Sequence, residues 1–482
     1  MSIYDRVFAY GDRLPDETAL IFEGGFFTYR QLQEYIKVAA NILQQRYLKP
    51  KEKALILLPN CPEFIIAFFS VVLAGGVVVL ADTKLNEELG QILLDNEIRL
   101  LFTDYAGREK LKKVSAKLPA NSFIEPFIID RQNFFSTCLA NVSGEGALSF
   151  EGNLDDEALI LYTSGSTGKP KGVINSHRTL RDALDNYSQT LSFTREDKLV
   201  AVTPFFHSYA LGSCVFTGLA AGATLLLSEE FHPRQILKLM TREKATVFHG
   251  VPYMYELFNQ HYNPQEYCLE NMSYFISAGT ALPEKVAREF YLRTKKVIHQ
   301  EYGSSETGTL ALNLSDDVDL NIKSVGRPLK NVTIDIRPEN NEETGIIYVK
   351  KTGCGVGYVG EKPFPKGWYS TGDIGMMLSG GYLRITGRQK KTINIAGLKV
   401  NPEEVECCLK EHPMVNDVKV VGEDHPDFGQ VIKAYVIRNN VSLTKLSLLS
   451  YCRQCLALYK VPSSIEWVEF LPKSGLGKNQ TL

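Results

Sequence analysis

The sequence predicts an α/β fold in which a large N-terminal domain of mostly parallel sheets with covering helices carries a small antiparallel β subdomain. A small α+β C-terminal domain follows. Through most of the first 330 residues, short apolar runs alternate with amphipathic helical stretches, a rhythm typical of parallel sheets covered by helices. From about residue 334 the pattern changes to short strand-like runs separated by Gly-rich turns. A chain of 482 residues is long enough for two or three packed units.

The elements of the N-terminal part follow from the spacing of apolar residues. Helices are predicted over residues 29–45, 63–73 and 85–96, and strands over residues 54–58, 77–80 and 100–103. The longest apolar run, residues 65–81, is interrupted by Ser70, Gly75 and Gly76. It therefore predicts a buried helix followed by a buried strand, and no membrane span.

The later elements are shorter. Antiparallel strands are predicted over residues 333–336, 345–350 and 381–386. A final unit begins near Gly387, where Pro402 precedes a predicted helix over residues 403–411, because proline is favoured at the first helical position. Strands over residues 417–421 and 431–437 and a helix over residues 443–458 complete this unit. We place the domain boundary between residues 389 and 390.

Composition narrows the function classes. With 44% hydrophobic and 22% charged residues and a net charge of −2, the chain has no overall attraction for nucleic acid or anionic membranes. Nine cysteines without repeating spacing predict free thiols in a reducing compartment. Cys452 and Cys455 form a CxxC in a helical stretch without a second ligand pair, so we expect no metal site there. The chain opens without a secretory signal and ends without a peroxisomal tripeptide, so a cytoplasmic protein is expected.

The most informative segment is residues 162–172, YTSGSTGKPKG. It follows a predicted buried strand, residues 159–162, and α/β sheets bind ligands where strands end. Its glycines let backbone N–H groups turn toward an anion, while hydroxyls and two lysines add donors and charge. Pro170 follows Gly168-Lys169, so the segment is not a Walker A loop. A plain Ser/Gly-rich surface loop is the alternative, but the composition and position favour a polyphosphate site.

This segment resembles the phosphate loop of the adenylate-forming superfamily, which includes acyl-CoA synthetases, aryl-CoA ligases, peptide-synthetase adenylation domains and luciferases. Further motifs of the family occur in the family's order. They are FFHS (205–208), YGSSETG (302–308), GRP (326–328), YSTGD (369–373), GRQKK (387–391) and LPKSGLGK (471–478). The resemblance covers essentially the whole chain and is closest to stand-alone acyl- or aryl-acid ligases.

The resemblance implies a two-step reaction. An acid attacks the α-phosphorus of ATP to give an acyl-adenylate and pyrophosphate, with Mg²⁺ bound, and the acyl group then passes to the thiol of CoA or of phosphopantetheine. Residues 1–389 would bind ATP and the acid, and residues 390–482 would form a mobile C-terminal AMP-binding-enzyme domain. Because an anion attacks an anion, cations and N–H donors must face the reacting oxygens.

The resemblance also assigns residues to roles. The catalytic residues would be Lys478, His207, Thr307 and Glu306, with Glu306 as the metal ligand. ATP would be bound by Thr163, Ser164, Gly165, Ser166, Thr167, Gly168, Lys169, Lys171, Tyr302, Asp373 and Arg388. The acid pocket would consist of His207, Ser208, Tyr209, Gly212, His249, Gly250, Ser277, Ala278, Gly279 and Thr280. Lys390 would be the hinge, and Gly397 would leave room for the pantetheine thiol.

The acid is narrowed by an absence in the fourth motif. Amino-acid-activating members carry an Asp after the Phe, whereas here Phe206 is followed by His207. An unpaired ammonium group in a buried pocket is costly, so α-amino acids are disfavoured, and an aryl or medium aliphatic acid is expected. Loading of a carrier protein in trans stays open beside CoA. A luciferase-like oxygenase and a non-enzymatic nucleotide-binding regulator are less favoured. We expect no nucleic-acid partner and a monomer or homodimer.

Overall fold

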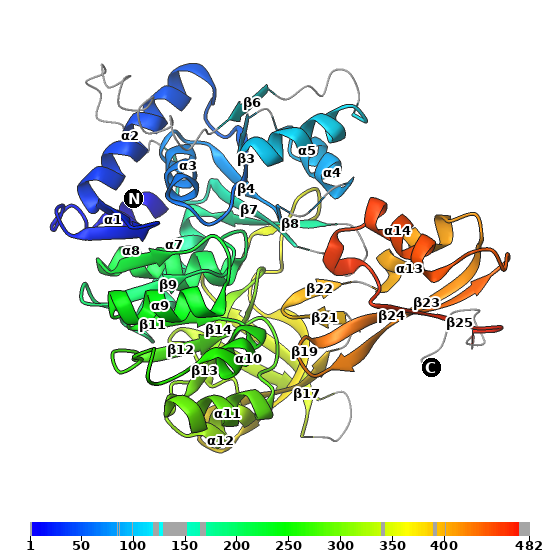
Figure 1. The fold of residues 1–482 in the computed structure, drawn as a ribbon. Coiled ribbons are helices and arrows are strands. Elements are labelled where there is room, and N and C mark those ends of the chain that lie inside the picture. The colour runs from blue at the N-terminus through cyan, green and yellow to red at the C-terminus, as the bar shows by residue number, and fades with distance from the viewer. Residues whose placement is uncertain are drawn as a thin grey trace.

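The computed structural model describes residues 2–83, 85, 87–98, 100–118, 125–128, 152–163, 170–338, 343–388, 393–400 and 402–471. The α/β prediction is confirmed (Figure 1). The described residues form two large, mostly parallel sheets, a four-stranded antiparallel sheet and a five-stranded sheet near the C-terminus. Figure 1 shows the C-terminal sheet and its two helices, in orange and red, on one side of the larger N-terminal part.

The first large sheet has seven strands in the order β18-β8-β7-β4-β3-β5-β6. Its strands are β3 (Lys53–Leu57), β4 (Val77–Leu80), β5 (Leu100–Thr103), β6 (Glu125–Ile128), β7 (Glu157–Thr163), β8 (Lys171–Ser176) and β18 (Gly357–Tyr358). The five strands from β7 to β6 are parallel, and β8 runs antiparallel to β7 with Thr163 opposite Lys171. The predicted strands over residues 54–58, 77–80 and 100–103 are therefore present. The phosphate-loop segment joins β7 to β8.

Helices cover this sheet: α3 (Pro62–Leu73), α4 (Glu87–Asp95) and α5 (Tyr105–Ser115). Every residue of α3 is buried, with Pro62 at its first turn, which explains the long apolar run seen in the sequence. Its phenylalanines pack in one core with residues of both large sheets. The predicted helix over residues 85–96 is α4.

The second large sheet has nine strands in the order β15-β14-β13-β12-β11-β9-β10-β1-β2. They are β1 (Thr18–Phe22), β2 (Gly25–Thr28), β9 (Lys198–Ala201), β10 (Thr224–Leu227), β11 (Val247–Gly250), β12 (Tyr274–Ser277), β13 (Ile298–Ser304), β14 (Gly308–Leu312) and β15 (Arg327–Pro328). The strands from β13 to β1 are parallel. Residues that follow β11, β12 and β13 therefore emerge at one edge of the sheet.

Helices surround this sheet, and one of them is unusual. The α-helices are α1 (Ile3–Phe8), α2 (Tyr29–Arg46), α7 (His177–Ser188), α8 (Thr217–Ala221), α9 (Pro233–Glu243), α10 (Pro252–His261), α11 (Glu284–Thr294) and α12 (Val318–Lys323). Helix α2 begins at a capping box between Thr28 and Gln31. A π-helix, η2 (Ala210–Phe216), follows the FFHS motif, and such wider turns occur frequently at functional sites.

The antiparallel subdomain is also present. Strands β16 (Val332–Arg337), β17 (Gly345–Lys351), β19 (Tyr369–Leu378) and β20 (Tyr382–Arg388) form one sheet, with a short 3₁₀ turn at Ser379–Gly381. The register of β19 and β20 sets Asp373 opposite Arg388. The two family motifs that contain these residues therefore meet across one strand pair.

The C-terminal unit has its own core. It consists of β21 (Ile393–Ile395), β22 (Leu398–Val400), α13 (Pro402–Glu411), β23 (Val415–His425), β24 (Gly429–Arg438), α14 (Lys445–Cys455), a 3₁₀ turn at Leu458–Lys460 and β25 (Ser464–Trp467). Helix α14 is shorter than the predicted helix over residues 443–458, because the backbone becomes extended at Leu456. The expected boundary between residues 389 and 390 lies outside the described residues.

Two further expectations concern the described residues. None of their helices has the length and apolar character needed to cross a membrane. Seven cysteines in this part of the chain, including Cys452 and Cys455, form no disulfide bond. Cys452 is fully buried in the C-terminal core, where it packs as a small apolar side chain.

Candidate active site

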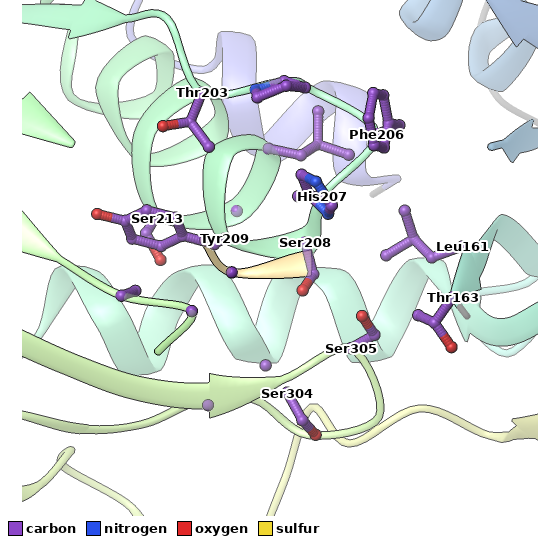
Figure 2. A pocket seen from close by; sticks show the side chains of 18 of the residues that line it. Leu161, Thr163, Thr203, Phe206, His207, Ser208, Tyr209, Ser213, Ser304 and Ser305 are labelled. Atoms are coloured by element: carbon purple, nitrogen blue, oxygen red, sulfur yellow. The ribbon is translucent and has the colours of Figure 1, made fainter. Parts of the chain in front are cut away.

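A cavity of about 1040 Å³ opens where strands of both large sheets end (Figure 2). Its wall combines residues after β7, β11, β12 and β13, residues of the π-helix and residues of the C-terminal unit. The predicted site residues on this wall are Thr163, Lys171, His207, Ser208, Tyr209, Gly212, Ala278, Gly279, Glu306 and Gly397. Motifs that are far apart in the sequence thus surround one space.

One part of the wall carries the charged groups expected near phosphates. Lys171 forms a salt bridge of 2.7 Å with Glu361 and lies 4.6 Å from the centre of the Tyr358 ring. The Tyr358 hydroxyl donates a hydrogen bond of 2.9 Å to Glu306 Oε1. Burial, followed by the charge of Glu306, raises the pKa of Tyr358, so this hydroxyl stays protonated and remains a donor. The tyrosine therefore orients Glu306 on the cavity wall.

The residues expected to hold the nucleoside lie close together. The Tyr302 hydroxyl donates a 2.7 Å hydrogen bond to Asp373, which is buried. Thr307 is completely buried, and its hydroxyl donates to the carbonyl of Gly308 at 2.9 Å. A contact from this hydroxyl to a phosphate therefore requires rotation of the side chain. The strand containing Arg388 runs beside Asp373.

The FFHS motif lies on the part of the cavity wall where the acid is expected. Figure 2 shows His207 and Ser208 between the Tyr209 and Ser213 side of the view and the Leu161 and Thr163 side. The ring centres of Phe206 and His207 are 4.5 Å apart. Burial lowers the pKa of His207 below its ordinary value, so its imidazole is neutral near pH 7. His207 therefore acts here as an uncharged aromatic and hydrogen-bonding group.

Two glycines on the wall have different surroundings. A Cβ atom placed on Gly212 would meet no other atom within 4 Å. Gly279 has a φ of +87°, and a Cβ atom on it would lie 3.7 Å from the Cα of Gly397 and from Val251. Gly212 therefore leaves volume for a ligand, whereas Gly279 allows the C-terminal unit to approach.

The other predicted acid-pocket residues lie behind or beside the cavity wall. The His249 carbonyl accepts from Thr203, and burial lowers the pKa of the His249 imidazole to about 3. A side chain on Gly250 would collide with the Phe248 ring. Ser277 is buried at the end of β12, and Thr280 follows Gly279 at the surface of that turn. Among the described residues, these four are not on the cavity wall.

A buried polar cluster around Glu301 in this wall was not predicted from the sequence. Glu301 accepts hydrogen bonds from Ser213 at 2.6 Å, Thr309 at 2.7 Å and Tyr187 at 3.2 Å. Burial raises the pKa of Glu301 to about 7. The available signal was its position directly before Tyr302 in a strand, because neighbouring strand residues face opposite sides. Two of its partners, Ser213 and Tyr187, come from distant segments, and none of the three belongs to a family motif.

The C-terminal unit contacts the cavity at two places. Asn394 Nδ2 donates to the Gly279 carbonyl at 3.3 Å, and the Gly397 N–H donates to Asn394 Oδ1 at 3.1 Å. Lys460 is fully buried and bonds to Glu88 of the N-terminal part at 3.0 Å and to Glu404 at 2.5 Å. These contacts hold Gly397 at the cavity in the observed arrangement.

Some predicted residues cannot be placed in this geometry. Lys478, Lys390 and the loop positions Ser164, Gly165, Ser166, Thr167, Gly168 and Lys169 lie outside the described residues. For Arg388 only the backbone is described. Their roles stay predictions.

Comparison with known proteins relates this geometry to a family. Residues 7–359 match the family model of the AMP-binding enzyme, and residues 404–478 match that of the AMP-binding enzyme C-terminal domain. The 2-succinylbenzoate–CoA ligase of Bacillus velezensis is 29% identical over 477 residues, covering 96% of this chain and 94% of the relative. The long-chain-fatty-acid–CoA ligase of Bacillus subtilis is 28% identical over 516 residues, covering 97% and 91%.

Solved structures of related enzymes are also similar along almost the whole chain. The chain is similar to a double mutant of o-succinylbenzoate CoA synthetase from Bacillus subtilis bound with its product analogue, with a TM-score of 0.87, 25% identity and coverage of 100% and 97%. It is also similar to ATP-bound MatB from Rhodopseudomonas palustris, with a TM-score of 0.73, 27% identity and coverage of 100% and 97%. From the family-model match over most of its length, the chain belongs to the AMP-binding enzyme family.

Proposed function

We propose that this protein activates a carboxylic acid with ATP, releases pyrophosphate, and transfers the acyl group from the acyl-adenylate to the thiol of CoA. The observation that carries this is a single cavity lined by Glu306, His207 and Gly397, which come from three distant segments of the sequence. Relatives along almost the full chain are ligases named for an acid and CoA. CoA is therefore favoured over a carrier protein.

The first step requires electrostatic help. The acid carboxylate and the α-phosphate are both negative, so fixed cations and donors must face the oxygens that gain charge. Lys171 on the wall and Lys478 in the last motif are the proposed cations. Asp373 and Tyr302, already joined by a hydrogen bond, would receive the ribose and the adenine. Thr307 would turn its hydroxyl toward the α-phosphate.

The residues present fit a magnesium ion that arrives with the nucleotide. Within the described residues, no three His, Cys, Asp or Glu side chains form a metal-binding group. Mg²⁺ commonly takes one or two protein carboxylates and fills its other positions with phosphate oxygens and water. Glu306, held by Tyr358 at the cavity, would supply such a carboxylate. When bound, the ion neutralises the pyrophosphate leaving group.

The acid is proposed to be an aryl or medium aliphatic acid. Aromatic and small residues share the wall around His207, and Gly212 leaves open volume beside them. The position after Phe206 is an imidazole that burial keeps neutral. An α-ammonium group would find no carboxylate at this position, and α-amino acids are therefore not proposed as substrates.

The observed domain arrangement supports thiol transfer as the second step. Gly397 faces Gly279 at the cavity, and a glycine pair leaves room for a narrow thiol arm. On this geometry we assign the observed arrangement to the reaction with CoA, and rotation about Lys390 to adenylation.

The experiment is a panel of aryl and aliphatic acids incubated with ATP and Mg²⁺, with CoA or with a phosphopantetheinylated carrier protein. Pyrophosphate release is measured together with the acylated product by mass spectrometry. We expect acid-dependent pyrophosphate release and an acyl-CoA product. Acylation of the carrier alone, with CoA inert, would contradict CoA as the acceptor.

A further inference from the structure

The buried carboxyl group of Glu301 has no part in the chemistry described above. Glu301 belongs to β13 and precedes Tyr302, whose hydroxyl bonds to Asp373 on the nucleotide side. Successive side chains of a strand face opposite sides, so Glu301 points away from the nucleotide residues. It lies on the cavity wall, and only 6% of the residue is exposed.

The hydrogen bonds of Glu301 leave one position to fill. Oε1 accepts from Ser213 at 2.6 Å and from Thr309 at 2.7 Å, whereas Oε2 accepts from Tyr187 at 3.2 Å. An ionised carboxylate can accept about four hydrogen bonds. The described residues account for three, so Oε2 can accept one more from a ligand in the cavity.

The charge of Glu301 also lacks a partner in the described part of the chain. Its three donors are neutral hydroxyls, and the salt bridges of the described residues do not include it. Burial raises its pKa to about 7, so the carboxylate form is poorly stabilised by its surroundings. A ligand that donates a hydrogen bond or carries positive charge would stabilise the carboxylate form, and a second anion would destabilise it.

The position of Glu301 fits the far end of a bound acid. The reacting carboxylate must lie toward the phosphate residues, represented by Thr163 and Lys171. Figure 2 shows Ser213, a partner of Glu301, on the opposite side of the view from Thr163. The neighbouring Gly212 leaves open space in front of this end. The distal part of the acid would therefore approach Glu301.

We propose that Glu301 is a specificity-determining residue that selects acids with a hydrogen-bond donor, a hydroxyl or a protonated amine, at the end distal to the reacting carboxylate. The same group rejects acids with a second carboxylate at that end. This assignment rests on the proposed acid-activating function and names its substrate class. Some relatives are ligases for acids with two carboxylates, such as oxalate, and this chain departs from that preference.

The test compares matched acids in the complete protein. The aliphatic series is hexanoate, 6-hydroxyhexanoate, 6-aminohexanoate and adipate. The aromatic series is benzoate, 4-hydroxybenzoate, 4-(aminomethyl)benzoate and terephthalate. Acid binding without ATP is measured by calorimetry, and kcat/KM by pyrophosphate release. In at least one series we expect the donor-bearing acids to exceed the unsubstituted acid by about tenfold or more, with the dicarboxylic acid lowest.

Glu301→Gln separates the two donors, because the amide keeps an acceptor oxygen but carries no charge. For the amine-bearing acid of each series, we expect the preference over the unsubstituted acid to fall by about tenfold or more. The preference for the hydroxy acid should change less, and binding of the dicarboxylic acid should improve. Glu63→Gln, which changes a buried carboxyl group in α3 away from the cavity wall, should leave all ratios unchanged.

Two results overturn the proposal. In one, the wild-type protein shows no preference for the donor-bearing acids in binding. In the other, Glu301→Gln lowers binding of every acid by the same factor, as a purely structural residue would. Preferential binding without pyrophosphate release from any acid would instead contradict the proposed function while leaving Glu301 as the selecting residue, so the two failures are distinguishable.

Discussion

Replacing Glu88 by Gln should slow reaction with CoA without slowing adenylation. Lys460 is the centre of a buried contact between the two domains, with Nζ 3.0 Å from Glu88 and 2.5 Å from Glu404. The side chains of Lys460, Glu88 and Glu404 are 1%, 11% and 11% exposed. Since Glu404 and Lys460 belong to the same domain, the substitution removes only the charge that crosses the interface.

The magnitude follows from burial. A hydrogen bond to a charged group contributes about 1.5–3 kcal/mol, which corresponds to roughly 10- to 150-fold in the population of the observed domain arrangement. Lys460 keeps its bond to Glu404, so the C-terminal unit should stay folded. The matched control is Glu423→Gln. Glu423 pairs with Lys433 at 3.2 Å within one domain and has a side chain that is 52% exposed, so its contribution is below about 1 kcal/mol.

The assay separates the two steps. Pyrophosphate release in a single turnover without CoA measures adenylation, and mixing the preformed enzyme-bound adenylate with CoA measures thioester formation. For Glu88→Gln we expect normal pyrophosphate release and thioester formation slowed by about tenfold or more. Equal slowing of both steps, or thioester formation at the rate of the Glu423→Gln control, would refute the assignment of this arrangement to thiol transfer.

Three further predictions concern single residues. Lys478→Ala should lose acid-dependent pyrophosphate release by roughly a hundred- to thousandfold, about 3–4 kcal/mol, while ATP binding by calorimetry persists; near-normal release would exclude the assigned role. Gly397→Val should raise KM for CoA, because a side chain is strained at its φ of +91° and would occupy the cavity wall beside Val251, whereas Gly360→Ala, with φ of +73° and open space away from the cavity wall, should not. The pKa of Glu301 is raised from 4.5 to about 7 by burial, so the folded protein binds the extra proton; this stability is present below pH 4.5 and is lost as pH rises through 7, by up to ~3 kcal/mol. Denaturant titrations from pH 4.5 to 8 should show a smaller loss in Glu301→Gln than in the wild type, because burial also raises the pKa of Glu404 to about 7 in both proteins; identical pH profiles would contradict the raised pKa of Glu301.

Local pattern was sufficient for the individual elements. The predicted helices over residues 29–45 and 63–73 are present as α2 and α3. The amphipathic spacing and capping Thr28 of α2, and the apolar run and initiating Pro62 of α3, act within a few residues. The error at the end of α14 has a local cause too. Apolar residues continue past Cys455, but the backbone becomes extended at Leu456, where the chain turns to place Lys460 in the interface.

Sheet order and side-chain partners depend on distant residues, and local pattern does not contain them. Strand β4 lies between β3 and β7, although about eighty residues separate β4 from β7 in the sequence. Glu301 meets Ser213, Thr309 and Tyr187 only because three different elements pack together. In the sequence, Lys460 has the character of a solvated surface lysine, and only domain packing gives it Glu88 as a partner.

For the site, the family resemblance identified positions that the spacing of apolar residues does not indicate. His207, Glu306 and Gly397 are far apart in the sequence, yet all three line one cavity. Other proposed members of the acid pocket, such as Gly250 and Ser277, lie behind the cavity wall, and their role stays a prediction. A motif names the positions near a site, whereas the side chains that reach the ligand depend on packing.

The most direct test of the account is a two-stage incubation analysed by mass spectrometry. The protein is first mixed with ATP, Mg²⁺ and an accepted acid, without CoA, and CoA is added afterwards. We predict that the first stage releases about one pyrophosphate per protein and retains acyl-adenylate, and that CoA then yields acyl-CoA and AMP. Formation of ADP and phosphate, or acyl-CoA formed without an adenylate intermediate, would contradict the two-step mechanism.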